Sequence, residues 1–350
     1  LASPEVRVLY SPVARVRFVL TLFFCYFNVF TTKERVILII HFWGVRGSLP
    51  APLTSLQIQS KINAVIQRVT PEDLVSLDAK TKFLAQLPDW IMGTVGGNTS
   101  CVEIKTDEAE ELIFDAGSGL ASYGHSNNLP SDHKYNFFFS HFHWDHIQGL
   151  PFFTPAFDPK SKIVFYSPFE NSKQFLEKQM ENPFFPVPFS SFTKNISFNS
   201  IKPDQGIFIG NTKINCCKMS HPGDSYSYSI ENNGKKVVYA TDIELKSRNF
   251  SNDESSCKTV FQDADCIILD SQYTVEEALQ KENWGHSAYC YAIDFAVFWN
   301  IKKIYLFHHE PTYDDKKLYS ILDSAKKYLK YINREDIQIE IAREDLEIEL

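Results

Sequence analysis

The chain has no pair of cysteines spaced as Cys-x-x-Cys, and its seven cysteines are an odd number. This pattern excludes a disulfide framework as the main source of stability and favours buried, reduced thiols in a cytoplasmic protein. Positive charge is also scarce, because 35 Lys and Arg stand against 43 Asp and Glu, a formal net charge of −8. This charge does not favour a long polyanionic partner such as nucleic acid and agrees better with a small substrate.

The N-terminal region lacks an apolar run that is long enough to cross a membrane comfortably. Residues 18–30 are uncharged, but these 13 residues match only the core of a signal peptide, and no small-x-small cleavage pattern follows closely. We expect residues 1–35 to be an appendage outside the fold, with a signal or an anchor as the alternative. Residues 36–350 are expected to form one domain without membrane contact.

The apolar share of the chain is large, since 44% of its residues are hydrophobic and 29 are Phe. Apolar runs predict strands at 36–42, 101–105, 111–115, 135–139, 163–166, 213–219, 225–231, 236–240, 266–269 and 303–307. Helices are expected at 56–69, 70–87, 171–180, 287–299 and 314–331. Two blocks of strands followed by helices predict an α/β fold with two sheets face to face and helices outside, a four-layer αββα sandwich.

The most informative segment packs three imidazoles and a carboxylate into six residues behind an apolar strand. It reads Ser140-His141-Phe142-His143-Trp144-Asp145-His146. Alternate side chains of an extended chain share a face, so His141 and His143 should project together, with Asp145 and His146 in the turn beyond. Neutral imidazole and carboxylate suit zinc or a similar metal. A hydrolytic metal site is therefore favoured over a surface histidine-rich turn.

Three more ligand-type side chains follow apolar strands in the second half of the chain. His221 follows the strand at 213–219, Asp242 the strand at 236–240, and His308 the strand at 303–307. Each stands where a rigid strand meets a solvent-facing loop, as binding residues often do. Because one fold must bring these residues together with the first cluster, they favour one large domain over two.

Two further segments have a structural and a functional interpretation. In Gly285-His286-Ser287, the Ser287 hydroxyl is a candidate cap for the following helix, which would leave His286 exposed at its start. Taken alone, His286 is better explained as a packing histidine. The proline-broken aromatic stretch at 182–189 would either form a wall at the mouth of a site or cover the core.

The His-x-His-x-Asp-His pattern at 141–146 resembles the metallo-β-lactamase superfamily. Other segments resemble its phosphodiesterase branch, which contains the tRNA 3′-processing endonucleases (RNase Z), cyclic-phosphate phosphodiesterases and bacterial cyclic-nucleotide phosphodiesterase-like proteins. These segments are Trp43-Gly44-Val45-Arg46-Gly47-Ser48, Gly96-Gly97-Asn98-Thr99-Ser100-Cys101, Phe114-Asp115-Ala116-Gly117-Ser118-Gly119 and Gln148-Gly149-Leu150-Pro151. The resemblance runs from about residue 41 to the end and implies a metallo-β-lactamase-like sandwich. Residues 53–92 would then be a helical insertion, which would serve as a lid over the site, form a dimer contact or have no function.

The resemblance also implies ligands for two divalent metal ions, zinc in the first place, with manganese or iron as alternatives. One ion would be held by His141, His143 and His221, the other by Asp145, His146 and His308, and both by a bridging Asp242. His308 is preferred over His309 because of its register behind the strand. Two cations about 4 Å apart can share a water and lower its pKa toward neutrality.

Further roles are implied near the metals. His286 would protonate the leaving oxygen or stabilise the charged phosphate, and Asp145 would also orient the hydroxide. Asn98 and Ser100 are the expected substrate contacts, with a plain turn as the alternative at 96–98. Beside the site, Asp115 should order the metal loop by hydrogen bonds and Asp270 should stand behind the ligands. Arg46 should be a buried structural ion-pair partner, with phosphate contact as its second interpretation.

We therefore expect a binuclear metal-dependent phosphodiesterase that hydrolyses a small phosphodiester, a cyclic nucleotide in the first place, with a homodimer as an open question. The alternatives are an RNase Z-like RNA 3′-end processing endonuclease, a hydrolase of lactams, lactones or thioesters, and a non-catalytic metal-binding protein. The sequence has no Gly- and Lys-rich arm, with which processing enzymes grip tRNA. A diiron oxidoreductase would normally carry an acidic residue in place of His143.

Overall fold

The computed structural model describes residues 38–106, 111–203, 205–246, 250 and 255–350. The segment expected to be an appendage, 1–35, lies outside the described residues. The described chain divides into two compact units, one formed by 55–93 and the other by 38–54 with 94–350. All the ligand-type residues belong to the larger unit.

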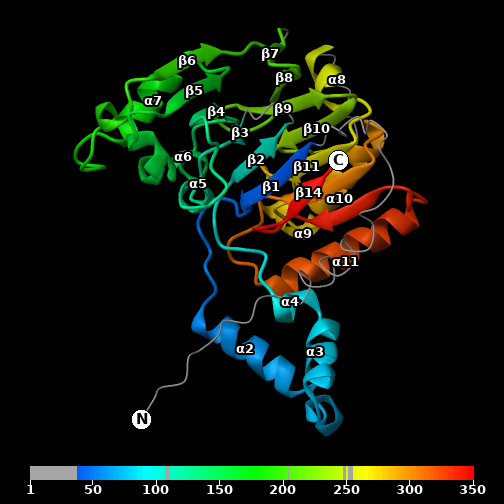
Figure 1. Cartoon of the computed structure of the whole chain (residues 1–350). Helices are drawn as coiled ribbons and strands as arrows, with labels where there is room; N and C mark the ends of the chain where they lie inside the picture. The colour runs from blue at the N-terminus through cyan, green and yellow to red at the C-terminus, as the bar shows by residue number, and fades with distance from the viewer. Residues whose placement is uncertain (1–37, 107–110, 204, 247–249, 251–254) are drawn as a thin grey trace, which may run out of the picture. The chain divides into compact units, whose positions relative to one another are not determined.

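The larger unit contains two seven-stranded sheets (Figure 1). The first has the order β14-β1-β2-β3-β4-β5-β6 and the second β13-β12-β11-β10-β9-β8-β7. The first sheet consists of β1 (Ile39–Gly44), β2 (Cys101–Lys105), β3 (Glu111–Phe114), β4 (Lys134–Phe138), β5 (Lys162–Ser167), β6 (Ile196–Ser200) and β14 (Glu347–Glu349). The second consists of β7 (Ile207–Ile209), β8 (Thr212–Met219), β9 (Ser225–Asn232), β10 (Lys235–Ala240), β11 (Cys266–Asp270), β12 (Lys303–Phe307) and β13 (Gln338–Ile341).

Alternation of side chains along the strands gives each sheet two apolar faces. Phe114 of β3 belongs to the main core, where its ring centroid lies 5.8 Å from that of Tyr228 and 5.5 Å from that of Tyr239 in the second sheet. Its chain neighbour Ile113 belongs to a second apolar cluster on the opposite face. The two sheets therefore pack face to face, and their outer faces are left for helices.

Helices cover these outer faces. Leu120 and Tyr123 of α5 (Gly119–Gly124) and Leu176 of α7 (Ser172–Gln179) belong to the second cluster. α10 (Tyr289–Phe298) contacts β11 and β12, and α11 (Asp315–Tyr331) contacts β13. Shorter helical segments are α6 (Trp144–Ile147), η2 (Leu150–Phe152), η3 (Thr154–Phe157), η4 (Phe189–Ser191), α8 (Ser255–Phe261) and α9 (Val275–Gln280). The predicted α/β, four-layer αββα sandwich is confirmed.

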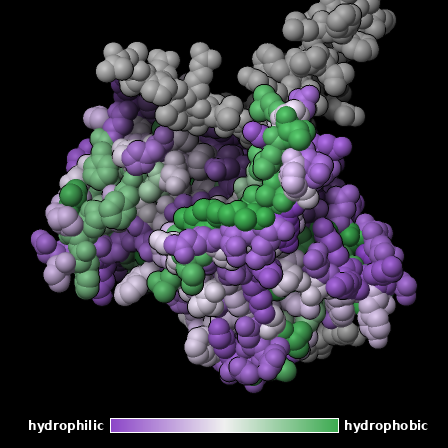
Figure 2. All heavy atoms as spheres, turned by 90° about the horizontal axis from the view of Figure 1, so that it is seen from below, coloured by the Kyte–Doolittle hydropathy of each residue, from purple (hydrophilic) through white to green (hydrophobic). Residues whose placement is uncertain are grey.

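The smaller unit is helical and consists of α2 (Ser55–Ile66), η1 (Pro71–Leu74), α3 (Leu77–Gln86) and α4 (Asp89–Met92). Its buried centre is small and contains Ala64, Leu87 and Ile91. Many of its large apolar side chains are exposed, among them Leu56, Ile62, Ile66, Val75 and Leu77. Figure 2 shows hydrophobic side chains gathered into continuous stretches on one face of the molecule.

Two expectations about elements need correction. The helix expected at 70–87 is divided into η1 and α3, because the Ser76 side chain accepts a hydrogen bond from the Ala79 N–H at 3.1 Å and starts a new helix. Four strands were not predicted: β6, β7, β13 and β14. All four are edge strands: β6, β13 and β14 alternate apolar and polar residues, and β7 is apolar but only three residues long, so the local signal is weak. Among the described residues, no helix has the length and apolarity needed to span a membrane.

Candidate metal centre

Ligand-type side chains from four strand ends converge at one edge of the sheets. β4 leads to His141 and His143, β8 to His221, β10 to Asp242 and β12 to His308. β10 and β12 both run parallel to β11, and β8 runs the same way as β10 because both pair antiparallel with β9. The carboxyl ends of these three strands of the second sheet therefore point in one direction, and the loop after β4 meets them.

The first group of converging atoms belongs to His141, His143, His221 and Asp242, whose ligand atoms all lie within 4.8 Å of one another. Asp242 Oδ2 lies 3.5 Å from His141 Nε2 and 3.7 Å from His221 Nε2. His143 Nδ1 lies 3.2 Å from His221 Nε2. Three imidazoles and one carboxylate oxygen thus face a common point.

The second group belongs to Asp145, His146 and His308. His308 Nε2 lies 3.2 Å from Asp145 Oδ2 and 3.3 Å from His146 Nε2. Asp242 Oδ1 lies 3.1 Å from His146 Nε2 and 3.1 Å from His308 Nε2. Asp242 therefore faces the first group with one carboxylate oxygen and the second group with the other, which is the geometry of a bridging ligand.

The chemistry of this donor set fits a pair of divalent ions. His141 Nε2 is buried and has no hydrogen-bond partner in the part of the chain that the structure describes, a state that is costly unless another species occupies its lone pair. Imidazole nitrogens and carboxylate oxygens in groups of three or four are the usual ligands of zinc and related metals.

Electrostatics favours positive charge at the same place. Burial lowers the pKa of His141 well below its ordinary value, so its imidazole is neutral. Burial tends to raise the pKa of Asp242, but the neighbouring imidazoles, His146 first, hold this pKa well below its ordinary value. For His146 burial acts to lower the pKa, yet the carboxylates of Asp242, Asp145 and Asp115 raise it well above the ordinary value.

Polar contacts behind the ligands orient their rings. His146 Nδ1 donates to Asp115 Oδ2 at 2.7 Å, and His221 Nδ1 donates to the Gly285 carbonyl at 2.9 Å. Asp115 also accepts hydrogen bonds from the Ser140 N–H at 2.8 Å and the Tyr239 hydroxyl at 2.7 Å. The predicted role of Asp115 in ordering the metal loop is confirmed. Such contacts fix the tautomer and leave Nε2 of both rings for a metal.

The backbone at the centre is held in an uncommon conformation. Asp115, Asp242 and His308 have φ angles of 59°, 51° and 60°, in the left-handed region that residues other than glycine rarely adopt. Strain of this kind persists where surrounding structure enforces it, and it clusters at functional sites. In addition, Gly47 and Gly285 have no room for a Cβ atom, which would clash with the rings of His308 and His221.

His286 lies beside both groups. Its Nδ1 donates to Asp270 Oδ2 at 2.8 Å and lies 4.0 Å from Asp242 Oδ2. Burial lowers the pKa of His286, but the Asp270 carboxylate and then Asp242 outweigh it and raise this pKa above its ordinary value. The expected place of Asp270 behind the site residues is confirmed, through His286.

The expectation about Ser287 was wrong. Its hydroxyl donates to the Ile243 carbonyl and accepts from the Leu245 N–H, so it joins two loops, and α10 starts after Ala288 without a side-chain cap. His286 is consequently not exposed at a helix start, since its side chain is only 10% exposed.

Other candidates lie away from the ligands. His309 Nε2 donates to the Ala342 carbonyl at 2.8 Å, which leaves His308 as the histidine at the centre. Asn98 donates to Glu344 Oε2 at 3.1 Å, and Ser100 is fully buried. Among the described residues, the Ser100 hydroxyl has no hydrogen-bond partner, and the Asn98 side chain is paired with Glu344.

Arg46 has a structural role, as expected, but with different partners. Its guanidinium is buried and donates to the backbone carbonyls of Gly96, Glu310 and Tyr313 at 2.8, 3.2 and 2.9 Å. Arg46 thereby ties the turn after β1 to the loop after β12, and these carbonyls take the place of the expected ion pair.

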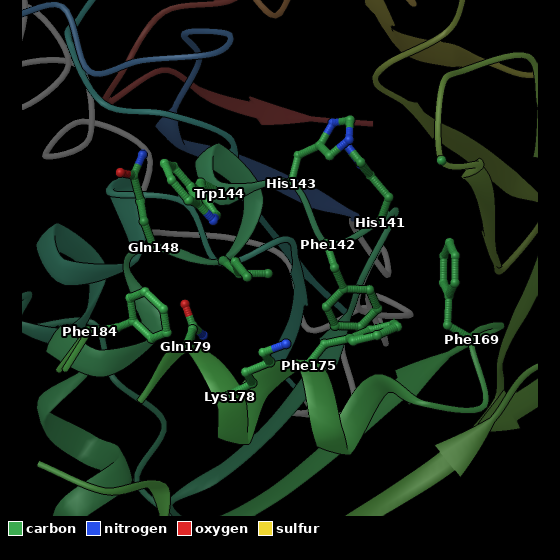
Figure 3. A pocket seen from close by; sticks show the side chains of 12 residues that line it. His141, Phe142, His143, Trp144, Gln148, Phe169, Phe175, Lys178, Gln179 and Phe184 are labelled. Carbon is green, nitrogen blue, oxygen red and sulfur yellow. The ribbon is translucent and has the colours of Figure 1, made fainter. Parts of the chain in front are cut away.

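Two adjoining cavities open at the ligands. One, of about 390 Å³, is lined by Ser48, Phe142, His143, Trp144, Asp145, Asp242 and His286. The other, of about 580 Å³, is mainly aromatic, and Figure 3 shows the side chains around it. Phe184, from the stretch expected to form a wall at the mouth of a site, lines this cavity. Sequence reasoning missed Phe169, Phe175, Lys178 and Gln179, whose local pattern is that of a loop and an ordinary surface helix.

Proteins of similar sequence include ribonuclease Z from several bacteria. Ribonuclease Z of Prochlorococcus marinus (strain MIT 9301) is 24% identical over 284 residues, which are 67% of this chain and 89% of that protein. Ribonuclease Z of Oceanobacillus iheyensis is 24% identical over 279 residues, 66% of this chain and 89% of that protein. The predicted class of a metallo-β-lactamase-superfamily, metal-dependent hydrolase is confirmed.

Solved structures share the fold at low sequence identity. The metallo-β-lactamase fold protein YhfI of Bacillus subtilis has a TM-score of 0.61 at 15% identity, and the match covers 90% of this chain and 100% of that chain. Unliganded yeast PDE1 has a TM-score of 0.60 at 14% identity, and the match covers 90% of this chain and 100% of that chain. Short-form human tRNase Z has a TM-score of 0.56 at 16% identity, and the match covers 89% of this chain and 98% of that chain.

Residues 98–281, more than half of the sequence, match the family described as Anti-Pycsar protein Apyc1. The chain therefore belongs to the Anti-Pycsar protein Apyc1 family.

Proposed function

We propose that the chain is a phosphodiesterase with two divalent metal ions, zinc in the first place, and that it hydrolyses a small cyclic nucleotide. The observation that carries the proposal is the position of Asp242, whose two oxygens face two separate groups of ligand atoms. His143, Asp145 and Asp242 of these groups line a cavity together with His286, a side chain able to transfer a proton.

The proposed ligands follow from the two groups. His141, His143 and His221 would hold one ion, Asp145, His146 and His308 the other, and Asp242 both. When bound, two such ions supply Lewis acidity and hydroxide at neutral pH. The chain itself supplies the geometry, because carbonyl, hydroxyl and carboxylate partners hold the opposite sides of several ligand rings.

His286 is the proposed proton donor to the leaving oxygen. Asp270 holds its Nδ1 at 2.8 Å, which leaves the other ring nitrogen for the cavity that the residue lines. A positioned acid of this kind typically contributes about 10²–10⁴-fold to a rate. Asp145 is also held in place, since its Oδ2 accepts a hydrogen bond from the Ser48 N–H at 2.8 Å.

A small substrate is supported by the charge and by the cavities. The formal net charge of −8 offers little attraction to a long polyanion. The cavity at the ligands measures about 390 Å³, and the six described cysteines that are free agree with a cytoplasmic place of action.

RNA 3′-end processing is the second candidate, because the curated relatives include ribonuclease Z from several bacteria. A comparison of kcat/KM for cyclic AMP, cyclic GMP, 2′,3′-cyclic nucleotides and a tRNA precursor separates the two. We expect the zinc-loaded chain to turn over a cyclic nucleotide faster than the precursor and to lose this activity after chelation.

Two variants test the centre itself. Asp242→Asn keeps the shape of the side chain but removes its charge, and should abolish both activity and stoichiometric zinc binding. Asp263→Asn, at an exposed turn, should change neither. Faster cleavage of the tRNA precursor would support the second candidate, and no turnover of any substrate by the zinc-loaded chain would support a non-catalytic metal-binding protein.

A further inference from the structure

We propose that the aromatic cavity beside the metal centre is a subsite for the base of the nucleotide, and that Phe184 and Gln179 determine its occupancy. This inference rests on the proposed function for the position of the phosphate. It adds a second anchoring point to the substrate, outside the metal ligands.

The position of the cavity suits this role. The cavities of about 580 Å³ and 390 Å³ share Phe142, His143 and Trp144 as lining residues, so they adjoin at the metal loop. A pocket for a small molecule typically measures about 300–1,000 Å³. One ligand can therefore place a phosphate at the metal ligands and extend its base into the aromatic cavity.

The inner wall of the cavity consists of aromatic rings packed against one another. The ring centroid of Phe142 lies 5.5 Å from that of Phe169 and 5.1 Å from that of Phe175. Figure 3 shows these three rings close together, with Phe175 rising from α7. Flat apolar surfaces of this kind accept the face of a planar heterocycle.

Two more aromatic side chains are left open to solvent beside it. Trp144 is 80% exposed and Phe184 is 72% exposed, and both line the cavity. Exposed aromatic groups that border a concave site mark a binding surface more often than a structural one. Stacking of a base on such a group is worth about 1–3 kcal/mol by alanine substitution, with little dependence on which base it is.

Polar groups in the cavity favour a heterocycle over an aliphatic chain. Gln179 Nε2 is buried and has no hydrogen-bond partner among the described residues, and Lys178 next to it also lines the cavity. An unpaired buried donor is unfavourable, and a base carries the carbonyl or ring-nitrogen acceptor that would pair with it. A lipid chain would leave this donor unpaired. In Figure 3, Gln179 lies beside Phe184, and Lys178 lies between Gln179 and Phe175.

The test compares a substrate that has a base with one that has none, in the zinc-loaded full chain. The substrates are 3′,5′-cyclic nucleotides of the four bases, the base-free 1-deoxyribose 3′,5′-cyclic phosphate, and methyl p-nitrophenyl phosphate as a probe of turnover at the metal centre. The variants are Phe184→Ala, Gln179→Met and the control Phe208→Ala, which removes an exposed phenyl group from β7. None of these residues belongs to the metal ligands, so the centre should stay intact.

We expect Phe184→Ala to raise KM for the cyclic nucleotides about tenfold, and to change kcat/KM for the base-free cyclic phosphate less than twofold. Gln179→Met should alter the order of preference among the four bases. Phe208→Ala should behave as the unchanged chain. An equal effect of Phe184→Ala on both substrates, or none on either, would overturn the base subsite.

Equilibrium binding separates this inference from the proposed function. Isothermal titration calorimetry of cyclic nucleotides is carried out on Asp242→Asn and on the chelator-treated chain, where turnover is not expected. Binding that Phe184→Ala weakens supports the subsite even if the unchanged chain hydrolyses no nucleotide. If the unchanged chain hydrolyses methyl p-nitrophenyl phosphate but neither hydrolyses nor binds nucleotides, the base subsite is wrong and the metal centre stands. If the unchanged chain neither binds nucleotides nor hydrolyses any of the substrates, both the base subsite and the proposed function are contradicted.

Discussion

His286 shows how a single side chain acquires a role from its neighbours. Asp270 holds one of its ring nitrogens, and the residue lines the cavity at the metal ligands. A packing histidine would not need a buried carboxylate behind it. These contacts support the proposed role of His286 as the proton donor to the leaving oxygen.

His286→Ala should lower kcat for a cyclic nucleotide by about 10²–10⁴-fold, because the leaving oxygen loses its proton donor. Zinc content, measured by mass spectrometry of the dialysed protein, should stay at the value of the unchanged chain. Asp270→Asn should give a smaller loss in kcat. A loss of zinc in His286→Ala equal to that in Asp242→Asn would instead place His286 among the groups that hold the metal.

Gly285 stands at a position that has no room for a side chain. Its φ is +92°, and a Cβ atom there would clash with the ring of His221. Gly285→Ala should displace His221, with loss of one zinc ion per chain and of most activity. Gly93→Ala is the matched control, since the nearest atom to its Cβ would be 3.6 Å away. Full zinc content in Gly285→Ala would show that His221 is not needed for metal binding.

At the scale of elements, β2 and β3 bring two carboxyl groups together in a buried place. Glu103 and Glu111 are both buried, and Lys105 Nζ lies 3.2 Å from Glu103 Oε1 and 3.9 Å from Glu111 Oε1. Burial and the neighbouring Glu103 raise the pKa of Glu111 to about 9. Glu111 is therefore protonated in the folded chain at neutral pH.

The free energy of unfolding should fall as pH rises from about 4.5 to about 9, because the folded chain keeps a proton on Glu111 that the unfolded chain releases. Glu111→Gln cannot release this proton and should flatten the fall, so that it is more stable than the unchanged chain at pH 8. Urea denaturation between pH 5.5 and pH 8.5 measures this. Identical slopes in both proteins would show that Glu111 is ionised after folding.

The edge strands mark where local signals are weakest. β6, β7, β13 and β14 lie at the four edges of the two sheets, and the burial of β13 and β14 alternates between buried and exposed residues. Their central neighbours are nearly continuous apolar runs, which explains why those strands were predicted and the edges were not.

At the scale of the whole molecule, the metal centre joins both sheets. Its ligands follow β4 in the first sheet and β8, β10 and β12 in the second. Bound ions should therefore act on global stability, by an amount that grows with the logarithm of the free ion concentration relative to Kd. The homodimer stays an open question, which light scattering of the purified chain would answer.

Removal of metal by a chelator should lower Tm by at least about 5 °C, since one ion at 100 times its Kd contributes about 2.7 kcal/mol. Differential scanning calorimetry with and without added zinc measures the shift. Asp242→Asn should start from the lower Tm and respond little to zinc. An equal Tm in the chelated and zinc-loaded chain would argue against metal binding at this centre.

The sequence by itself determined the strand–loop positions of the ligand-type residues and the class of fold, because apolar periodicity and ligand spacing are local properties. It also identified His286, although only through its resemblance to a family. The resemblance already favoured His308 over His309, and the tertiary structure supplies the physical reason, since His309 Nε2 donates to the Ala342 carbonyl while His308 lies among the ligand atoms. Only the tertiary structure shows that Ser287 joins two loops and does not cap α10. It also brought α7 and the 182–189 stretch to the metal loop. Contacts between distant segments leave no periodic trace in the chain, and they emerge only when the sheets are packed.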